Sequence, residues 1–311
     1  MSRPITINFY GFWSSFRAED FLAQHPYLRS GYTLQVSDDP DFAICGVFPD
    51  SRPVPERAVK VFFTGENVAP NFAEHDWAMS FEHFTPPEPR HLRLPIYAWY
   101  MRQFSGGLEV LIRQPGEKAG LDRPHFCNFV YRNGMCRPRN QLFRQLNRYK
   151  HVDAPATLMN NMPMFPENGD GNSPAKQRFA RNYKFTIAYE NTSHPGYTTE
   201  KIYDAMAARS IPIYWGNPLV HLDFNPKSFL NRHEFDSDEA FIQRIIRVDQ
   251  DDELYTRIFN EPYWHDNIVP EALSDRACME FWDRVFASGA SRGRRARPRY
   301  SVFGGQHRPV E

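Results

Sequence analysis

The clearest hydrophobic pattern lies in residues 183–218, where two short apolar runs flank a helical pattern. KFTIAY (184–189) is an apolar run with polar residues on both sides, which is typical of a buried strand. In TTEKIYDAMAARS (198–210) apolar residues recur at helical spacing, and IPIYWG (211–216) is a second apolar run that ends at a glycine. The pattern predicts a strand, a crossover helix and a parallel strand, the repeating unit of open α/β sheets.

Similar runs predict further strands and helices in both halves of the chain. Strands are predicted at 5–12, at two places within 32–48, at 58–67 and at 125–133. A helix is predicted within 134–149, where Leu142, Phe143 and Leu146 share one side. Residues 225–262 predict a strand followed by two helices, and 271–287 predict another amphipathic helix.

A segment rich in glycine, proline and charge, residues 105–125, predicts a linker between domains. With 311 residues, the chain is long enough for two domains with real cores. We therefore expect an N-terminal α/β domain over 1–119, a C-terminal α/β domain over 120–285 and a flexible basic tail over 286–311. The tail holds five arginines between residues 292 and 299. It is interpreted either as a peripheral contact to anionic lipid or as a solvated extension without a partner.

Functional groups concentrate at the turn that follows the strand KFTIAY. Glu190 and Asn191 end this strand, and Tyr197, Glu200 and Lys201 lie in the loop and the first helical turn. Open α/β sheets bind ligands beyond the carboxyl ends of their strands, and a helix N-terminus attracts phosphate. Lys201 adds a cation there, and Glu200 can accept hydrogen bonds from sugar hydroxyls. Together they predict a nucleotide-sugar site, the alternative being that both residues only decorate a first turn.

The same segment resembles the α-1,3-fucosyltransferases of glycosyltransferase family 10. The similarity rests on YEN (189–191), YTTEK (197–201) and IPIYWGNP (211–218), which form a long, ordered match. The resemblance implies a GT-B fold, in which two Rossmann-like domains face each other across a cleft. It also implies inverting transfer of L-fucose from GDP-β-L-fucose to an acceptor glycan. The default acceptor is the GlcNAc 3-hydroxyl of a Galβ1-4GlcNAc unit, which gives a Lewis-type product.

The resemblance further assigns roles to single residues. FTGEN (63–67) matches a family motif whose Glu is the proposed general base, here Glu66, whereas the residues alone favour a solvated turn carboxylate. An Arg-Asn pair at a helix start matches Arg139 and Asn140, and the Arg of that pair contacts the diphosphate in the family. Glu190 is expected to hold the loop. The remaining donor contacts are expected from Asn191, Tyr197, Glu200 and Lys201.

Composition and charge limit which partners this chain can be expected to bind and in which cellular compartment it is expected. Lys and Arg number 37, as do Asp and Glu, so no net charge draws the chain to nucleic acid. No apolar run approaches the roughly 20 residues of a membrane span, and no signal peptide is visible. The four cysteines lack the spacing of a metal site. We expect a bacterial or viral protein in the cytoplasm, or peripheral at the inner face of the membrane. Its partners would be GDP-fucose and an oligosaccharide or lipid-linked glycan.

No metal is assigned, and no cofactor is required, because fixed cations and helix amides would stabilise the leaving diphosphate. Nonessential stimulation by Mn²⁺ or Mg²⁺ stays open. Asp39 and Asp41 have the D-x-D spacing of some metal-diphosphate sites, but Pro40 between them favours a turn. The alternatives are a GT-B transferase for another GDP-sugar, a non-catalytic glycan-binding protein and a dinucleotide oxidoreductase. The last is disfavoured because no G-x-G-x-x-G follows a strand.

Overall fold

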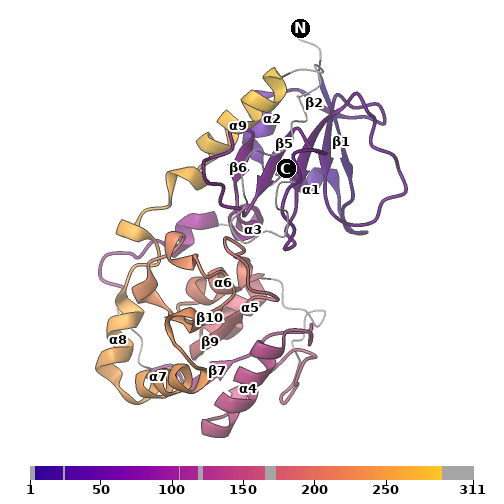
Figure 1. Ribbon diagram of the computed structural model, residues 1–311. Helices are drawn as coiled ribbons and strands as arrows, with labels where there is room; N and C mark the ends of the chain where they lie inside the picture. Colours follow the sequence, from indigo (N-terminus) through magenta and orange to yellow (C-terminus); the bar gives the residue numbers. More distant parts are fainter. Residues whose placement is uncertain (1–3, 24, 105, 118–121, 165–172, 289–311) are drawn as a thin grey trace. The chain divides into compact units, whose positions relative to one another are not determined.

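The computed structural model describes residues 4–23, 25–104, 106–117, 122–164 and 173–288 (Figure 1). The chain divides into two compact units. Unit 2 spans Gly106–Val269, and unit 1 consists of the residues before it together with those from Pro270 onward. Each unit contains one parallel sheet, so the expected composition of two Rossmann-like α/β units is confirmed.

Unit 1 is built around a six-stranded parallel sheet in the order β2-β1-β3-β4-β5-β6. Its strands are β1 (Ile5–Tyr10), β2 (Leu34–Val36), β3 (Phe42–Cys45), β4 (Val59–Phe63), β5 (Trp77–Ser80) and β6 (His91–Arg93). Its helices are α1 (Ala18–Ala23), α2 (Pro26–Gly31), α3 (Ile96–Tyr100) and α9 (Asp275–Ala287), with short 3-10 turns at Met101–Gln103 and Glu271–Leu273. The strands predicted within 5–12, 32–48 and 58–67 are all present.

Helices pack against one face of this sheet. Phe9 of β1 contacts Phe21 of α1, with ring centroids 5.0 Å apart. Trp77 of β5 contacts Phe281 of α9, with ring centroids 5.8 Å apart. Ser274, the residue before α9, is its N-cap, and the Ser274 hydroxyl accepts a hydrogen bond from the backbone N–H of Ala277 at 3.1 Å.

Loops rather than helices cover the opposite face of the unit 1 sheet. Tyr10, Cys45 and Phe62 are in register on β1, β3 and β4, so their side chains share this face. The segments that follow β3 and β4, residues 46–58 and 64–76, contain no helix, and they lie over this face as loops. One face is thus covered by helices and the other by two loops.

Unit 2 is built around a five-stranded parallel sheet in the order β11-β10-β9-β7-β8. Its strands are β7 (His125–Asn128), β8 (Val152–Asp153), β9 (Tyr183–Tyr189), β10 (Ile211–Trp215) and β11 (Leu230–Asn231). Its helices are α4 (Arg137–Tyr149), α5 (Ser173–Ala180), α6 (Glu200–Ala207), α7 (Asp238–Gln250) and α8 (Asp252–Asn260), and 3-10 turns include Gly107–Leu111. β9, α6 and parallel β10 form the strand-helix-strand unit predicted for residues 183–218.

The units divide the chain differently from the expected boundaries at 119 and 285. The segment 106–117 is not a loose linker, because Leu108 and Leu111 are buried and Arg113 Nη1 bonds Glu117 Oε1 at 3.1 Å within unit 2. Glu117 in turn pairs with Arg209. Helix α9, expected in the second domain, belongs to unit 1, because its aromatic side chains complete that sheet's core. Of the expected tail, residues 289–311 lie outside the described residues.

None of the helices among the described residues combines the length and the apolar character needed to cross a bilayer.

Candidate functional site

Glu190, directly after β9, holds the loop that leads into α6. Its carboxylate is fully buried. Oε1 accepts a hydrogen bond from the backbone N–H of Thr199 at 2.8 Å, and Oε2 accepts one from the Thr199 hydroxyl at 2.6 Å. Thr199 is the N-cap residue of α6, yet its side chain makes no cap hydrogen bond, because the hydroxyl is directed to Glu190. The expected structural role of Glu190 therefore has a clear geometric basis.

Lys201 lies between two carboxylates at the start of α6. Its Nζ is 3.3 Å from Glu190 Oε2 and 3.5 Å from Glu200 Oε1, and it donates to the Thr199 hydroxyl at 2.9 Å. Burial alone would lower the pKa of Lys201, but Glu200 and Glu190 outweigh it and raise the pKa. Burial tends to raise the pKa of Glu200, whereas Lys201 and Lys176 lower it to about 2. Both groups are therefore charged at neutral pH.

The turn after β10 locks this loop in place. Gly216 has φ +153, and a Cβ there would lie 2.3 Å from Glu190 Cγ, so no other residue fits. The neighbouring Asn217 accepts a hydrogen bond from the backbone N–H of Gly196 at 2.6 Å and donates to the Thr198 hydroxyl at 3.0 Å. The carboxyl ends of β9 and β10 and the start of α6 thus form one connected hydrogen-bond network.

Arg139, near the start of α4, contacts the carboxyl end of β9 and the loop that follows it. Its side chain is fully buried, and its guanidinium lies 4.0 Å from the centroid of the Tyr131 ring. Its hydrogen bonds go to neutral oxygens: Nη1 donates to Asn191 Oδ1 at 3.0 Å and to the Tyr189 carbonyl at 3.4 Å, and Nη2 donates to the Asn133 carbonyl. Its buried Nε has no hydrogen-bond partner among the described residues.

Arg139 is therefore a buried cation whose described contacts include no carboxylate. Burying a charge without an opposite charge is costly, so such an arrangement favours an anionic ligand. The planar guanidinium matches the oxygens of phosphate two at a time. With Lys201 and the positive end of the α6 dipole, the strand ends of unit 2 form a site suited to a diphosphate.

The structure brings the five predicted donor-binding residues together within unit 2, but they differ in exposure and in their contacts. Asn191 is exposed and contacts Arg139, and Glu200 is partly exposed beside Lys201. Tyr197 is 3% exposed, so its ring is part of the loop's packing. Asn140, beside Arg139, donates to the Gly134 carbonyl at 2.7 Å, whereas its Oδ1 has no partner in the described part of the chain.

Sequence reasoning missed two residues of this site. Tyr131 carries Arg139 on its ring, and its hydroxyl donates to the Ile187 carbonyl at 2.8 Å. Lys176 of α5 lines a small cavity of about 30 Å³ together with Tyr131 and Lys201. The aromatic-rich run HFCNFVYRN (125–133) before α4 was a usable signal for Tyr131. Lys176 follows a long polar segment without periodicity, so nothing in the pattern pointed to it.

Glu66, the predicted base, lies in unit 1 on the loop after β4. Its side chain is exposed, and its backbone N–H donates to the Thr64 hydroxyl at 3.0 Å. The preceding Gly65 lies against α3, since a Cβ there would be 2.9 Å from two carbons of Ile96. The loop backbone is therefore fixed at its start, and the Glu66 side chain is exposed to solvent.

Other candidates from the sequence have local roles. Asp39 and Asp41 are both engaged by Arg57, with Nη1 3.5 Å from Asp41 Oδ1, and Asp41 also accepts from the Thr6 hydroxyl at 2.8 Å. Arg137, at the start of α4, is exposed, in contrast to Arg139. Within the described part of the chain, no group of three or more His, Cys, Asp or Glu side chains is arranged to hold a metal ion.

Two family profiles match this chain. The profile described as "Glycosyltransferase family 10 (fucosyltransferase) C-term" matches residues 123–285, just over half of the chain. The profile "Alpha-(1,3)-fucosyltransferase FucT N-terminal domain" matches residues 7–100, which include Glu66. The first range contains every candidate residue of unit 2.

Two curated relatives match over most of this chain. The "Alpha-(1,3)-fucosyltransferase FucT" of Helicobacter pylori is 29% identical over 274 residues, covering 76% of this chain and 56% of that protein. The "GDP-fucose protein O-fucosyltransferase 3" of Bos taurus is 28% identical over 230 residues, covering 69% of this chain and 46% of that protein. The chain thus spans only about half the length of either relative.

Among solved structures, a crystal structure of an alpha1,3-fucosyltransferase with GDP-fucose matches with a TM-score of 0.73 and 26% identity. The match covers 91% of this chain and 90% of that one, which confirms the fold class expected from the sequence. On the strength of the matching profiles, the chain belongs to glycosyltransferase family 10, the fucosyltransferase family.

Proposed function

We propose that this protein transfers L-fucose from GDP-β-L-fucose to a hydroxyl of an acceptor glycan, with inversion. The observation that carries the proposal is Arg139, a buried guanidinium with an unpartnered Nε and no carboxylate among its described contacts. A diphosphate would supply the missing negative charge. The similarity to an alpha1,3-fucosyltransferase with GDP-fucose supports this choice of donor.

In this proposal the residues of unit 2 hold the donor. Arg139 and Lys201 bind the diphosphate, and the positive end of α6 adds to their field. Glu200, partly exposed and charged, accepts hydrogen bonds from sugar hydroxyls, and Asn191 offers an exposed amide at the same strand end. Glu190 and Thr199 orient Lys201, so its ammonium is fixed before the donor arrives.

Glu66 would act as the general base of a single in-line displacement. The acceptor hydroxyl gives its proton to the Glu66 carboxylate, and its oxygen forms a bond to the anomeric carbon of fucose. The bond from that carbon to the phosphate oxygen breaks, and GDP leaves with the electron pair. Attack opposite the leaving group inverts a β-linked donor into an α-linked product.

The proposal requires no resident metal, because Arg139 and Lys201 are fixed cations that can stabilise the departing diphosphate. Stimulation by Mn²⁺ or Mg²⁺ is a separate question. We expect transfer to continue in EDTA at a rate within about tenfold of that with Mn²⁺, and complete loss in EDTA would contradict this part of the proposal.

Two acceptor classes need to be compared. The Helicobacter pylori relative supports a glycan acceptor, and we propose the GlcNAc 3-hydroxyl of a Galβ1-4GlcNAc unit, which would give a Lewis-type product. The Bos taurus relative is a protein O-fucosyltransferase by name, so a serine or threonine hydroxyl is the second candidate.

The test is a screen of donors and acceptors with analysis of the product's linkage. Donors are GDP-fucose and GDP-mannose, and acceptors are Galβ1-4GlcNAc, Galβ1-3GlcNAc and folded proteins with exposed serine or threonine. We expect an α-1,3-fucosylated Galβ1-4GlcNAc from GDP-fucose alone. Transfer from GDP-mannose but not GDP-fucose would overturn the donor, and fucosylated protein without fucosylated glycan would overturn the acceptor.

We also propose that the protein functions in the cytoplasm. All four cysteines are buried free thiols, which suits a reducing compartment. Fractionation of producing cells tests this, and recovery of the protein from an extracellular or periplasmic fraction would contradict it.

A further inference from the structure

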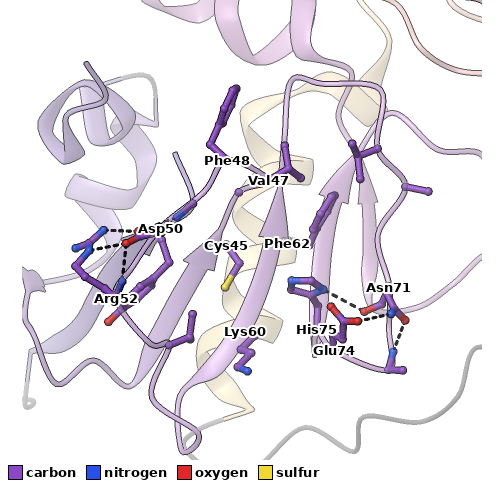
Figure 2. A pocket seen from close by; sticks show the side chains of 17 residues that line it. Cys45, Val47, Phe48, Asp50, Arg52, Lys60, Phe62, Asn71, Glu74 and His75 are labelled. Carbon is purple, nitrogen blue, oxygen red and sulfur yellow. Dashed lines mark hydrogen bonds and ion pairs between the residues drawn. The ribbon is translucent and has the colours of Figure 1, made fainter. Parts of the chain in front are cut away.

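A groove of about 650 Å³ lies on the loop-covered face of the unit 1 sheet (Figure 2). Its floor includes Tyr10, Cys45 and Phe62, which are in register on β1, β3 and β4. The volume is within the range of sites that hold small ligands. Neither the donor site of unit 2 nor the chemistry proposed for Glu66 makes use of it.

The groove exists because two loops cover this face incompletely. A parallel sheet normally buries both faces under helices. Here the buried side chains form two separate clusters. One contains Tyr10, Ala43, Cys45 and Ala58, with Val54 packed against it, and the other contains Phe62, Phe72 and Ala78, with Val47 and Phe84 packed against it. The space between the clusters is left open.

Polar side chains stand on both sides of this apolar floor (Figure 2). On one side, Arg52 Nη2 is 2.8 Å from Asp50 Oδ2, and the guanidinium lies 5.1 Å from the centroid of the Tyr10 ring. On the other side, Asn71 Nδ2 donates to Glu74 Oε1 at 2.9 Å, and the Asn71 carbonyl bonds His75 Nδ1 at 3.1 Å. Both walls are therefore held in shape by internal bonds.

Two groups in the groove are available to a ligand. The ammonium of Lys60, on β4, has no hydrogen bond or ion pair with the described residues, whereas its backbone N–H donates to Asp76 Oδ2 at 2.9 Å. His75 has Nδ1 occupied by the Asn71 carbonyl, and burial lowers the pKa of this ring, so Nε2 is an acceptor at neutral pH. Lys60 thus offers a donor and His75 an acceptor over an apolar floor.

This combination fits sugar rings better than the other common ligands. A sugar presents apolar C–H surface together with hydroxyls that both donate and accept. A lipid chain would leave Lys60 unsatisfied. A polyanion is disfavoured because Asp50 and Glu74 balance Arg52 and Lys60 among the lining residues.

The groove is linked by the chain to the proposed base. Val68 and Ala69 line it, and the backbone N–H of Val68 donates to the Glu66 carbonyl at 2.7 Å. Resting on the proposed function, we infer that the groove holds the sugar units of the acceptor glycan beyond the one that carries the reacting hydroxyl. The protein would accordingly prefer a longer oligosaccharide to a disaccharide.

The experiment measures KM for acceptors of one, two and three Galβ1-4GlcNAc units, and KM for GDP-fucose. Two variants alter the groove: Val68→Trp fills it from a position that is 43% exposed, and Lys60→Met removes the ammonium but keeps the stem. Val36→Trp is the matched control, since Val36 on β2 is 48% exposed and does not line the groove.

We expect the wild-type KM to fall about tenfold from one unit to three, a typical gain from one good contact region. Val68→Trp should remove this preference, Lys60→Met should reduce it, and Val36→Trp should retain it, with KM for GDP-fucose unchanged throughout. A wild type without length preference, or variants that keep it fully, would overturn the inference.

Failure of the proposed function gives a different result, namely no fucose transfer to any acceptor by the wild type. In that case calorimetric titration of the full chain with the three-unit oligosaccharide decides about the groove. Binding that Val68→Trp abolishes and Val36→Trp retains supports a glycan groove, and absence of binding to the wild type overturns it.

Discussion

The charged cluster of unit 2 and the Glu66 loop of unit 1 differ in how firmly their functional groups are held. In unit 2, Glu190 and Arg139 are fully buried, and each makes several hydrogen bonds to the loop or strand ends. In unit 1, Glu66 is exposed, and its hydrogen bonds to the described residues are made by its backbone. Removing a buried charge disturbs folding as well as chemistry, whereas an exposed carboxylate can be lost with an effect on chemistry alone. The comparison separates proposed binding groups that are part of the fold from a proposed base that is not.

The largest expected effect is on catalysis by Glu66→Gln. Loss of a general base typically slows a reaction by about 10²–10⁴-fold, and the exposed position predicts no change in folding. The measurements are kcat with saturating GDP-fucose and the Kd for GDP. Glu19→Gln, another exposed carboxylate of unit 1, is the control. Turnover close to wild type in Glu66→Gln would show that the base is elsewhere.

Arg139→Met should slow transfer by about 10²–10³-fold, by analogy with the loss of one group that stabilises developing negative charge. It should also weaken GDP binding, because it removes the guanidinium that lies over the Tyr131 ring and donates to Asn191 Oδ1. Arg137→Met on the same helix is the control, since Arg137 is exposed. Calorimetric titration with GDP checks both variants, and equal losses in both would refute a specific role for Arg139.

Measuring the free energy of unfolding tests the contrast between the buried groups of unit 2 and the exposed Glu66 directly. Glu190→Ala leaves Lys201 without one of its partners in a buried setting, so the free energy of unfolding should fall by about 3–5 kcal/mol. Glu66→Ala should change it by no more than about 0.5 kcal/mol. Denaturant unfolding, with urea midpoints and slopes for both variants, measures the difference. Similar losses for the two variants would remove the contrast drawn between the units.

As pH falls, unit 1 should lose folding stability before unit 2 does. In unit 1, burial lowers the pKa of His25 and His91 from 6.5 to about 3, and it also lowers the pKa of His75. When folding lowers the pKa of a histidine, the unfolded chain binds the proton at a higher pH than the folded chain does. The stability contributed by the neutral His25 and His91 is therefore complete above pH 6.5 and is lost as pH falls toward 3. In unit 2, among the described histidines, the same direction of shift applies only to His233, which is exposed.

The pKa shifts of Glu190 and Glu200 in unit 2 affect the free energy of unfolding at lower pH than those of the histidines. The lowered pKa of Glu200, about 2 against a usual 4.5, gives stability that is lost only as pH falls below 4.5. The raised pKa of Glu190 works in the opposite sense. Hydrogen exchange followed by mass spectrometry at pH 7, 5.5 and 4.5 should show protection lost first in unit 1, and less so in His25→Phe. Earlier loss in unit 2 would contradict this.

Much of the fold could be predicted because strands and helices have local signatures. The run KFTIAY and the helical spacing after it gave β9, α6 and β10 in the correct parallel arrangement. The alternation of side chains in parallel strands was not sufficient to show that one face of the unit 1 sheet is covered by loops. That result depends on residues 46–58 and 64–76. No periodicity in these two segments indicates that they cover the strands.

The candidate site divides in the same way. The order of residues in the chain alone placed Glu190, Asn191, Glu200 and Lys201 at one strand-helix turn, because they are close in sequence. It also identified the family through those same residues. It could not show that Lys201 is already paired with two carboxylates, or that Tyr131 supports Arg139.

What the sequence by itself determined, then, is the pair of α/β units and the chemical types gathered at the end of β9. Tertiary structure alone decided which of those charges are buried, paired or free, and that α9 returns to unit 1. It also created the groove over Tyr10, Cys45 and Phe62. The physical reason is that burial and pairing depend on contacts between residues far apart in the chain, whereas periodicity reports only on neighbours within a few turns.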